Sequence, residues 1–271
     1  MTVNNKKILF IGSGNMAQAI ISGMLCKKLI NPENIICNDV LEETLNTVKN
    51  KYGVSIVNEK KDAVAGADII FLAVKPQNMQ DVLRDISAFV KPETFVISIA
   101  AGISTSFIEN ILGGSTPAVR AMPNLLSAVG EGVTALCGGK YASKDNLKIA
   151  ADIFLAVGTA YEVTEDKFDA VTALSGSGPA YVFYLCELMQ QAGEKLGLDK
   201  EIAKIFALQT LYGSGKMLVQ TGVDAAVLRQ KVTSPGGTTA AAIKCFEDNK
   251  FYDIVLNAMK KASDRSKELS K

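Results

Sequence analysis

The chain has 271 residues, enough for two folded domains, because single hydrophobic cores become uncommon near this size. Its 29 basic and 28 acidic residues leave a formal net charge of +1, so no strong field attracts nucleic acid or an anionic membrane. The longest apolar runs are too short to cross a bilayer, and we expect a cytoplasmic protein that acts on a small molecule.

The sequence contains no histidine, which removes the commonest metal ligand and the commonest general acid or base. Catalytic pairs of serine or cysteine with histidine are excluded as well. The five cysteines are odd in number and widely spaced in apolar stretches, so we interpret them as reduced core residues and expect no metal site. A core strand begins by residue 6 or 7, and we expect no signal peptide. A reaction whose reactive atoms come from a cofactor fits these limits.

Short apolar runs alternate with helical patterns through about the first 160 residues. This alternation predicts an α/β domain with a doubly wound, mostly parallel sheet and right-handed crossovers. The expected strands are residues 7–11, 34–37, 54–56, 69–74, 94–99, 118–122, 132–137 and 160–163. The expected helices between them are residues 17–28, 41–51, 62–65, 79–88, 105–111 and 144–156.

Helical periodicity replaces the strand signals after residue 164. The pattern predicts a Rossmann-like domain over residues 1–164 and an all-helical domain over residues 165–271. Within the second, the Ser/Gly-rich segment 175–179 is expected to break the chain before a helix over residues 180–196, with another over residues 200–219. So much apolar helix surface predicts pairing with a second copy.

A glycine turn links the first expected strand to the first expected helix. Gly12 suits a tight turn, Gly14 lets the backbone approach a pyrophosphate, and small Ala17 lets the helix pack close to the strand. Free N–H groups at the helix start would face the phosphates. We therefore predict a dinucleotide site here, to which three more residues of the turn belong: Ser13, Asn15 and Met16.

Three later loops follow expected strands at the carboxyl edge of the sheet, where ligands bind in open parallel sheets. Lys75 is expected either near the nicotinamide ribose or as an ordinary solvated side chain. The small residues after the strand at 94–99 offer backbone on which a flat ring could lie. The cofactor contacts expected in these loops are Ala73, Val74, Lys75, Pro76, Ala100, Ala101 and Gly102.

A second glycine turn lies in the helical half, over residues 231–240. It combines four hydroxyl side chains with two glycines ahead of a helix expected from about Thr238. Hydroxyls and exposed N–H groups at a helix start form an anion site without a cation, which suits a substrate carboxylate. The same residues are typical of an ordinary N-cap, and the local pattern alone favours capping.

Six blocks occur in the order and spacing of the pyrroline-5-carboxylate reductase family: residues 11–17, 73–76, 98–102, 120–124, 175–181 and 234–239. The chain resembles this family along nearly its whole length. The resemblance implies reduction of the cyclic imine 1-pyrroline-5-carboxylate to L-proline by NADPH or NADH, the last step of proline biosynthesis. It also implies a homodimer interlaced through the helical domain, or larger assemblies of dimers, with the active site near the subunit boundary.

The resemblance also implies how the second glycine turn binds the substrate. It puts the carboxylate on Ser234, Gly237 and Thr238, with Gly236 in the same turn and the ring nitrogen near Thr239. Thr239 would orient the imine and could relay a proton, so it is the expected catalytic residue. A protonated imine is already electrophilic, so positioning it beside the nicotinamide is the main task and needs no histidine.

The cues to the coenzyme conflict. Asp39 follows Ala17 by 22 residues, where an acid binds the ribose hydroxyls of NADH and repels the 2′-phosphate of NADPH. Asn38 could face the ribose instead, because the sequence leaves open by one position which residue of this loop does so. Lys60 falls where many members of the family carry an adenosine-contacting asparagine, and a lysine there could attract the phosphate. Both coenzymes stay open.

Two other functions compete. The β-hydroxyacid dehydrogenases also join a Rossmann domain to a helical one, but they need a lysine near the position of Val182, so the sequence argues against alcohol oxidation. A non-catalytic protein that senses a nucleotide is the other alternative. The turn over residues 234–239 argues against it.

Overall fold

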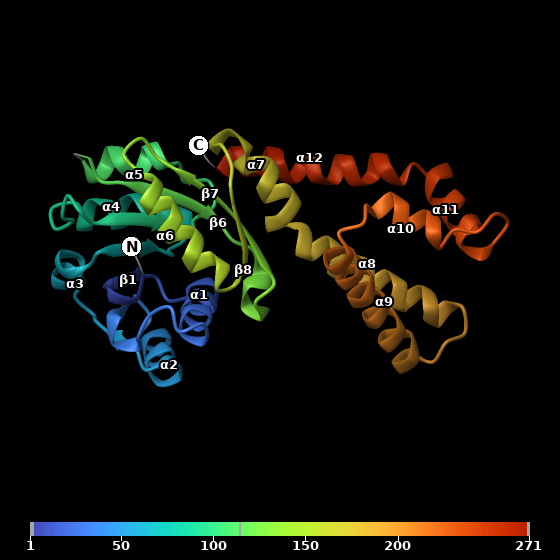
Figure 1. Ribbon diagram of the computed structural model, residues 1–271, viewed down its shortest axis with the longest axis horizontal. Coiled ribbons are helices and arrows are strands. Elements are labelled where there is room, and N and C mark those ends of the chain that lie inside the picture. The colour runs from blue at the N-terminus through green and yellow to red at the C-terminus, as the bar shows by residue number, and fades with distance from the viewer. Residues whose placement is uncertain (1–2, 114, 270–271) are drawn as a thin grey trace. The chain divides into compact units, whose positions relative to one another are not determined.

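The computed structural model in Figure 1 describes residues 3–113 and 115–269. They form two compact units. The first contains the residues up to Ser177 and those from Ala262 onward, and the second is Gly178–Lys261. The boundary that we propose between residues 164 and 165 lies earlier, because it marks where strand patterns end rather than where contacts thin out.

The first unit is built on one sheet, with strands in the order β3-β2-β1-β4-β5-β6-β7-β8. Every neighbouring pair is parallel except β6 with β7. The strands are β1 (Ile8–Ile11), β2 (Ile35–Asn38), β3 (Ser55–Ile56), β4 (Ile69–Leu72), β5 (Phe95–Ser98), β6 (Ala118–Met122), β7 (Gly132–Gly138) and β8 (Gly158–Glu162). The predicted mostly parallel, doubly wound sheet is confirmed, and its chain order reverses between β1 and β4.

Six helices cover the two faces of this sheet (Figure 1). They are α1 (Asn15–Cys26), α2 (Glu42–Tyr52), α3 (Lys61–Gly66), α4 (Met79–Ile86), α5 (Thr105–Leu112) and α6 (Lys144–Leu155). Because side chains alternate along a strand, Phe10 and Phe71 pack with α1, α2 and α6, whereas Leu9 packs with α3, α4 and α5. Phe10 and Phe71 stack with ring centroids 4.5 Å apart, and Phe154 of α6 meets Phe71 at 6.2 Å.

The helical part of the chain contains α7 (Phe168–Val171), α8 (Gly178–Lys195), α9 (Lys200–Thr221), α10 (Ala225–Lys231), α11 (Thr238–Asp248) and α12 (Phe251–Leu269). Of these helices, α10 and α12 are not among those expected from the sequence. No helix in residues 3–113 or 115–269 is long and apolar enough to cross a membrane. All five cysteines are free thiols, two of them exposed.

The Ser/Gly-rich segment does not break the chain as expected. It forms a π-helical turn, Thr172–Gly176, directly after α7 and shortly before α8. Pro179 has no N–H to give to the carbonyl of Ser175 four residues earlier. The side-chain amide of Asn124 donates to that carbonyl instead, at 3.1 Å. Asn124, which follows β6, thus supplies the donor that Pro179 lacks, and only Ser177 separates the π turn from α8.

The last strand starts two residues earlier than expected because Gly158 has a conformation that other residues avoid. Its φ is +148°, and it lies opposite Gly132 of β7. A Cβ at Gly158 would come within 1.9 Å of the Gly132 carbonyl oxygen. Glycine at this position therefore lets β8 pair along its full length.

We predict that Gly158→Ala lowers the free energy of unfolding by about 3 kcal/mol, because backbone must move and φ is strained. Gly66→Ala is the control, since Gly66 is exposed on α3 and a Cβ there meets no heavy atom within 4 Å. That variant is expected to be unchanged or up to about 1 kcal/mol more stable. Urea denaturation at one protein concentration measures both. Equal stability of the two variants would contradict this account of β8.

Candidate coenzyme and substrate sites

The turn between β1 and α1 is held between the neighbouring strands. The N–H of Gly12 donates to the carbonyl of Asn38 at 2.8 Å, and the N–H of Ala73 donates to the carbonyl of Ile11 at 2.8 Å. Gly12 has a φ of +95°, and a Cβ on it would lie 2.5 Å from the carbonyl oxygen of Ala73. Only glycine fits here, because the ends of β1 and β4 approach so closely.

The start of α1 is open to a ligand. Gly14 is the N-cap and no side chain caps the helix, so N–H groups of its first turn are available to an anion. A Cβ on Gly14 would meet no heavy atom within 4 Å, and Gly14 and Asn15 are exposed. Ala17 is buried against the sheet. This open, uncapped turn fits the pyrophosphate of a dinucleotide.

Asp39, directly after β2, is fixed by two backbone donors. The Ser13 N–H donates to its Oδ2 at 2.7 Å, and the Leu41 N–H donates to its Oδ1 at 3.0 Å. Asn38 is buried and turned away, because its side-chain amide donates to the carbonyls of Val57 and Asn58, each at 3.0 Å. Of the two candidates after β2, the structure therefore brings Asp39 to the glycine turn.

Two titratable groups on neighbouring segments, Cys37 and Lys60, do not bring a free charge to this turn. Burial raises the pKa of Cys37 to about 12, opposed by a hydrogen bond from Ser13, so the thiol stays neutral at pH 7. The Nζ atom of Lys60 lies 2.5 Å from a carboxylate oxygen of Asp85. Asp39 is therefore the charged group that contacts the turn itself.

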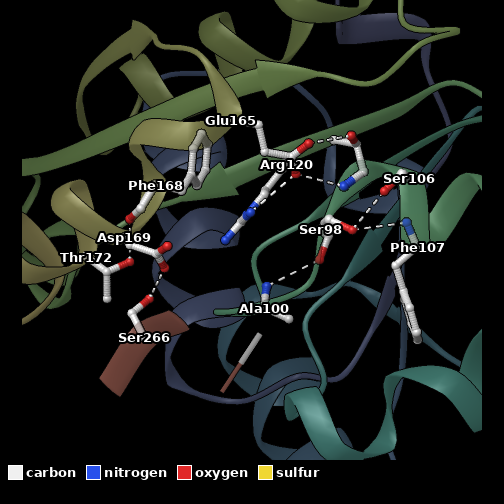
Figure 2. A network of polar contacts seen from close by, with 12 residues as sticks. Ser98, Ala100, Ser106, Phe107, Arg120, Glu165, Phe168, Asp169, Thr172 and Ser266 are labelled. Atoms are coloured by element: carbon white, nitrogen blue, oxygen red, sulfur yellow. Dashed lines mark hydrogen bonds and ion pairs between the residues drawn. The ribbon is translucent and has the colours of Figure 1, made fainter. Parts of the chain in front are cut away.

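The expected contacts after β4 and β5 lie at the same carboxyl edge as the glycine turn, since these strands are parallel to β1. Ala73 reaches the turn directly, through the bond from its N–H to Ile11. Val74 and Pro76 are half-buried and Lys75 is exposed. Ala100 is buried, and its N–H donates to the hydroxyl of Ser98 at 3.3 Å (Figure 2).

Ala101 and Gly102 line a hollow of about 180 Å³ in the first unit. Its other walls come from the π turn and the end of α12: Thr172, Ser177, Ala262, Arg265, Ser266 and Leu269. The hydroxyl of Ser266 donates to Asp169 at 2.7 Å, which ties the end of α12 to α7 (Figure 2). The predicted ring-binding loop thus borders a space that is completed by chain segments at least 70 residues further along the sequence.

A polar network missed by the sequence analysis supports this edge. Arg120 of β6 is 6% exposed, lies 3.2 Å from a carboxylate oxygen of Glu165, and stacks its guanidinium over the Phe168 ring at 4.4 Å (Figure 2). Glu165 accepts the N–H and the hydroxyl of Thr105, at 2.9 and 2.8 Å. Its carboxylate therefore also satisfies the start of α5, just after the Ala101 and Gly102 loop. In the sequence, this network could have been suspected from Arg120, a charged residue inside an otherwise apolar strand.

The second unit contains the hydroxyl-rich turn. The N–H of Gly237 donates to the carbonyl of Ser234 at 3.0 Å, and Gly236 has a φ of +72°. Gly237 is the N-cap of α11, without a side-chain cap. Ordinary capping, which the local pattern favoured, is therefore not what these hydroxyls do. Ser234 and Thr238 are exposed and Thr239 is half-buried, so the turn offers hydroxyls and uncapped N–H groups together.

The chain thus has two candidate sites: a turn on a parallel sheet that fits a dinucleotide, and an uncharged turn at a helix start that fits an anion. In the part of the chain that the structure describes, no three Cys, Asp or Glu side chains come together as a metal site would require. This arrangement defines a nicotinamide-dependent oxidoreductase of Rossmann-like fold.

Comparisons with known proteins identify the family. The model "NADP oxidoreductase coenzyme F420-dependent" matches residues 7–102, and "Pyrroline-5-carboxylate reductase dimerisation" matches residues 165–269. A pyrroline-5-carboxylate reductase of Methanosarcina acetivorans is 41% identical, over 99% of this chain and 100% of that protein. One of Bacillus spizizenii is 38% identical, over 98% of this chain and 90% of that protein. The chain belongs to the pyrroline-5-carboxylate reductase family.

Solved structures agree with this assignment. A pyrroline-5-carboxylate reductase from Coxiella burnetii has a TM-score of 0.93 and 39% identity, covering 99% of this chain and all of that one. A pyrroline carboxylate reductase from Plasmodium falciparum, with NADP bound, has a TM-score of 0.88 and 31% identity over the same shares. The resemblance, the fold class and a nicotinamide coenzyme are confirmed, whereas the roles of individual residues stay predictions.

We predict that Arg120→Met lowers the free energy of unfolding by about 2 kcal/mol, because it leaves the Glu165 carboxylate without its cation. In the double variant Arg120→Met/Glu165→Gln the loss should be smaller than the sum of the single losses. Urea denaturation of the four proteins completes the cycle. Strictly additive losses would mean that Arg120 and Glu165 do not interact energetically.

Proposed function

We propose that the chain reduces 1-pyrroline-5-carboxylate to L-proline with NADPH or NADH, the closing step of proline biosynthesis. The observation that carries the proposal is the pairing of an open dinucleotide turn at Gly12 and Gly14 with an uncapped hydroxyl turn at α11 in one chain. When bound, the dihydronicotinamide supplies the hydride. Membership of the family supports the choice of a cyclic imine as the acceptor.

The coenzyme site of this proposal has three parts. The turn over residues 12–17 binds the pyrophosphate, with N–H groups and no cationic side chain. At the adenosine end, Asp39 receives the ribose, whereas the side chains of Asn38 and Lys60 already have other partners within the chain. The loops with Ala73, Val74, Lys75, Pro76, Ala100, Ala101 and Gly102 receive the nicotinamide half.

The substrate site is the turn from Ser234 to Thr239. Ser234, Gly237 and Thr238 bind the carboxylate with hydroxyl and N–H donors, while Gly236 gives the turn its positive φ. Thr239 orients the ring nitrogen and holds a proton near it. A site without histidine suffices because an iminium carbon accepts hydride readily, so most of the acceleration comes from alignment.

The second unit supports self-association into dimers or assemblies of dimers. Its buried side chains are few and mostly small, where α8 packs on α9: Pro179, Cys186, Ala203 and Ala207. Many large apolar side chains on the same helices are exposed, among them Phe183 at 54%, Phe206 at 63% and Val219 at 84%. A second copy would cover this surface. Five free thiols support a reducing, cytoplasmic location.

Thr239→Ala is expected to lower kcat by about 10- to 100-fold, because the imine loses its orienting hydroxyl. The Kd of the reduced coenzyme, measured by fluorescence without substrate, should stay within about twofold. Thr239→Ser should recover most of kcat. Thr233→Ala is the matched control, since the Thr233 hydroxyl already donates to the carbonyl of Arg229. An unchanged kcat in Thr239→Ala would refute the role of Thr239.

Light scattering at micromolar concentration is expected to give a mass of at least two chains. A mass of one chain, 28.9 kDa, would remove self-association from the proposal.

A further inference from the structure

The carboxylate of Asp39 cannot turn away from the dinucleotide site without loss. One oxygen holds the N–H of Ser13, inside the glycine turn, and the other holds the N–H of Leu41. Rotating the side chain would leave two backbone donors without their partner. A carboxylate fixed in this way keeps lone pairs for a hydroxyl donor and keeps its full charge beside any incoming anion.

The surroundings of Asp39 reinforce its charge rather than balance it. Residues 38–48 include Glu42 and Glu43 as well as Asp39, and no lysine or arginine. Both glutamates lie in the first turn of α2, where backbone N–H groups would otherwise attract a phosphate. The residues that follow Asp39 are apolar and exposed: Val40 at 97% and Leu41 at 62%.

Two lysines at the start of α3, the N-cap Lys60 and Lys61, already have partners. Lys60 lies 2.5 Å from Asp85 of α4, and recruiting it to a phosphate would leave Asp85 unpaired. The Nζ atom of Lys61 lies 5.0 Å from the centre of the Phe89 ring. The side chain of Asn38 also has its partners within the chain, because its amide donates to two carbonyls of the segment between β3 and α3.

We infer that Asp39 makes this chain selective for NADH against NADPH. The 2′-hydroxyl of NADH donates to the fixed carboxylate, whereas the 2′-phosphate of NADPH only accepts hydrogen bonds and carries like charge. This inference rests on the proposed function only in that the coenzyme occupies the glycine turn. Of the three residues that the sequence offered as determinants of the coenzyme, Asn38, Asp39 and Lys60, only Asp39 then sets the preference.

The test is direct binding of each reduced coenzyme by calorimetry or fluorescence, without imine. The wild-type chain is expected to bind NADH about 100-fold more tightly than NADPH, and added salt should narrow the gap by screening. Asp39→Asn keeps the shape and removes the charge, so the ratio should shrink by about tenfold or more. Glu93→Gln removes the same charge from the turn before β5, at the opposite sheet edge, and should leave the ratio unchanged.

Equal or tighter binding of NADPH by the wild type would overturn the inference, as would an Asp39→Asn ratio equal to that of the wild type. If Asp39→Asn does not fold, the wild-type ratio and its salt dependence decide alone. Imine reduction is assayed separately with both coenzymes. If the protein prefers NADH but does not reduce the imine, the proposed function is refuted and the inference about Asp39 stands. If it reduces the imine but prefers NADPH, the proposed function stands and the inference about Asp39 is refuted.

Discussion

The position of β1 between β2 and β4 governs the coenzyme site. Both edges of β1 are hydrogen-bonded, so the carbonyl of Ile11 and the N–H of Gly12 point to opposite neighbours and meet Ala73 and Asn38. These bonds draw the end of β4 so close that no Cβ fits at Gly12. The same approach places Asp39, the next residue after β2, against the N–H of Ser13. The site is thus a consequence of strand order, since any side chain at Gly12 would force the strand ends apart.

The chemistry follows from what each unit offers. The first unit provides an N–H-lined turn and one fixed carboxylate, which suit a dinucleotide, and the second provides hydroxyls and N–H groups suited to a carboxylate. The sequence has no histidine, the side chain whose ordinary pKa lies closest to neutrality. Imine reduction is compatible with this set because the electrophile arrives activated.

Sequence patterns predicted the features that depend on local residues. The apolar run at residues 69–74 predicted β4 (Ile69–Leu72), and Gly12 and Gly14 predicted the glycine turn after β1, because burial and steric limits act through neighbouring positions. Features that depend on partners far away in the sequence were not predicted. The start of β8 depends on Gly132, and the carbonyl of Ser175, which Pro179 cannot satisfy, depends on the amide of Asn124. No pattern near Arg120 indicates Glu165 as its partner, 45 residues later.

We propose that one chain combines a nicotinamide site with a site for a cyclic imine carboxylate. This is tested by following oxidation of reduced coenzyme by the purified protein while 1-pyrroline-5-carboxylate is added, and by measuring the L-proline formed. Oxidation is expected to depend on the imine, with one proline formed per coenzyme oxidised. No imine-dependent oxidation with either NADH or NADPH would contradict the proposal.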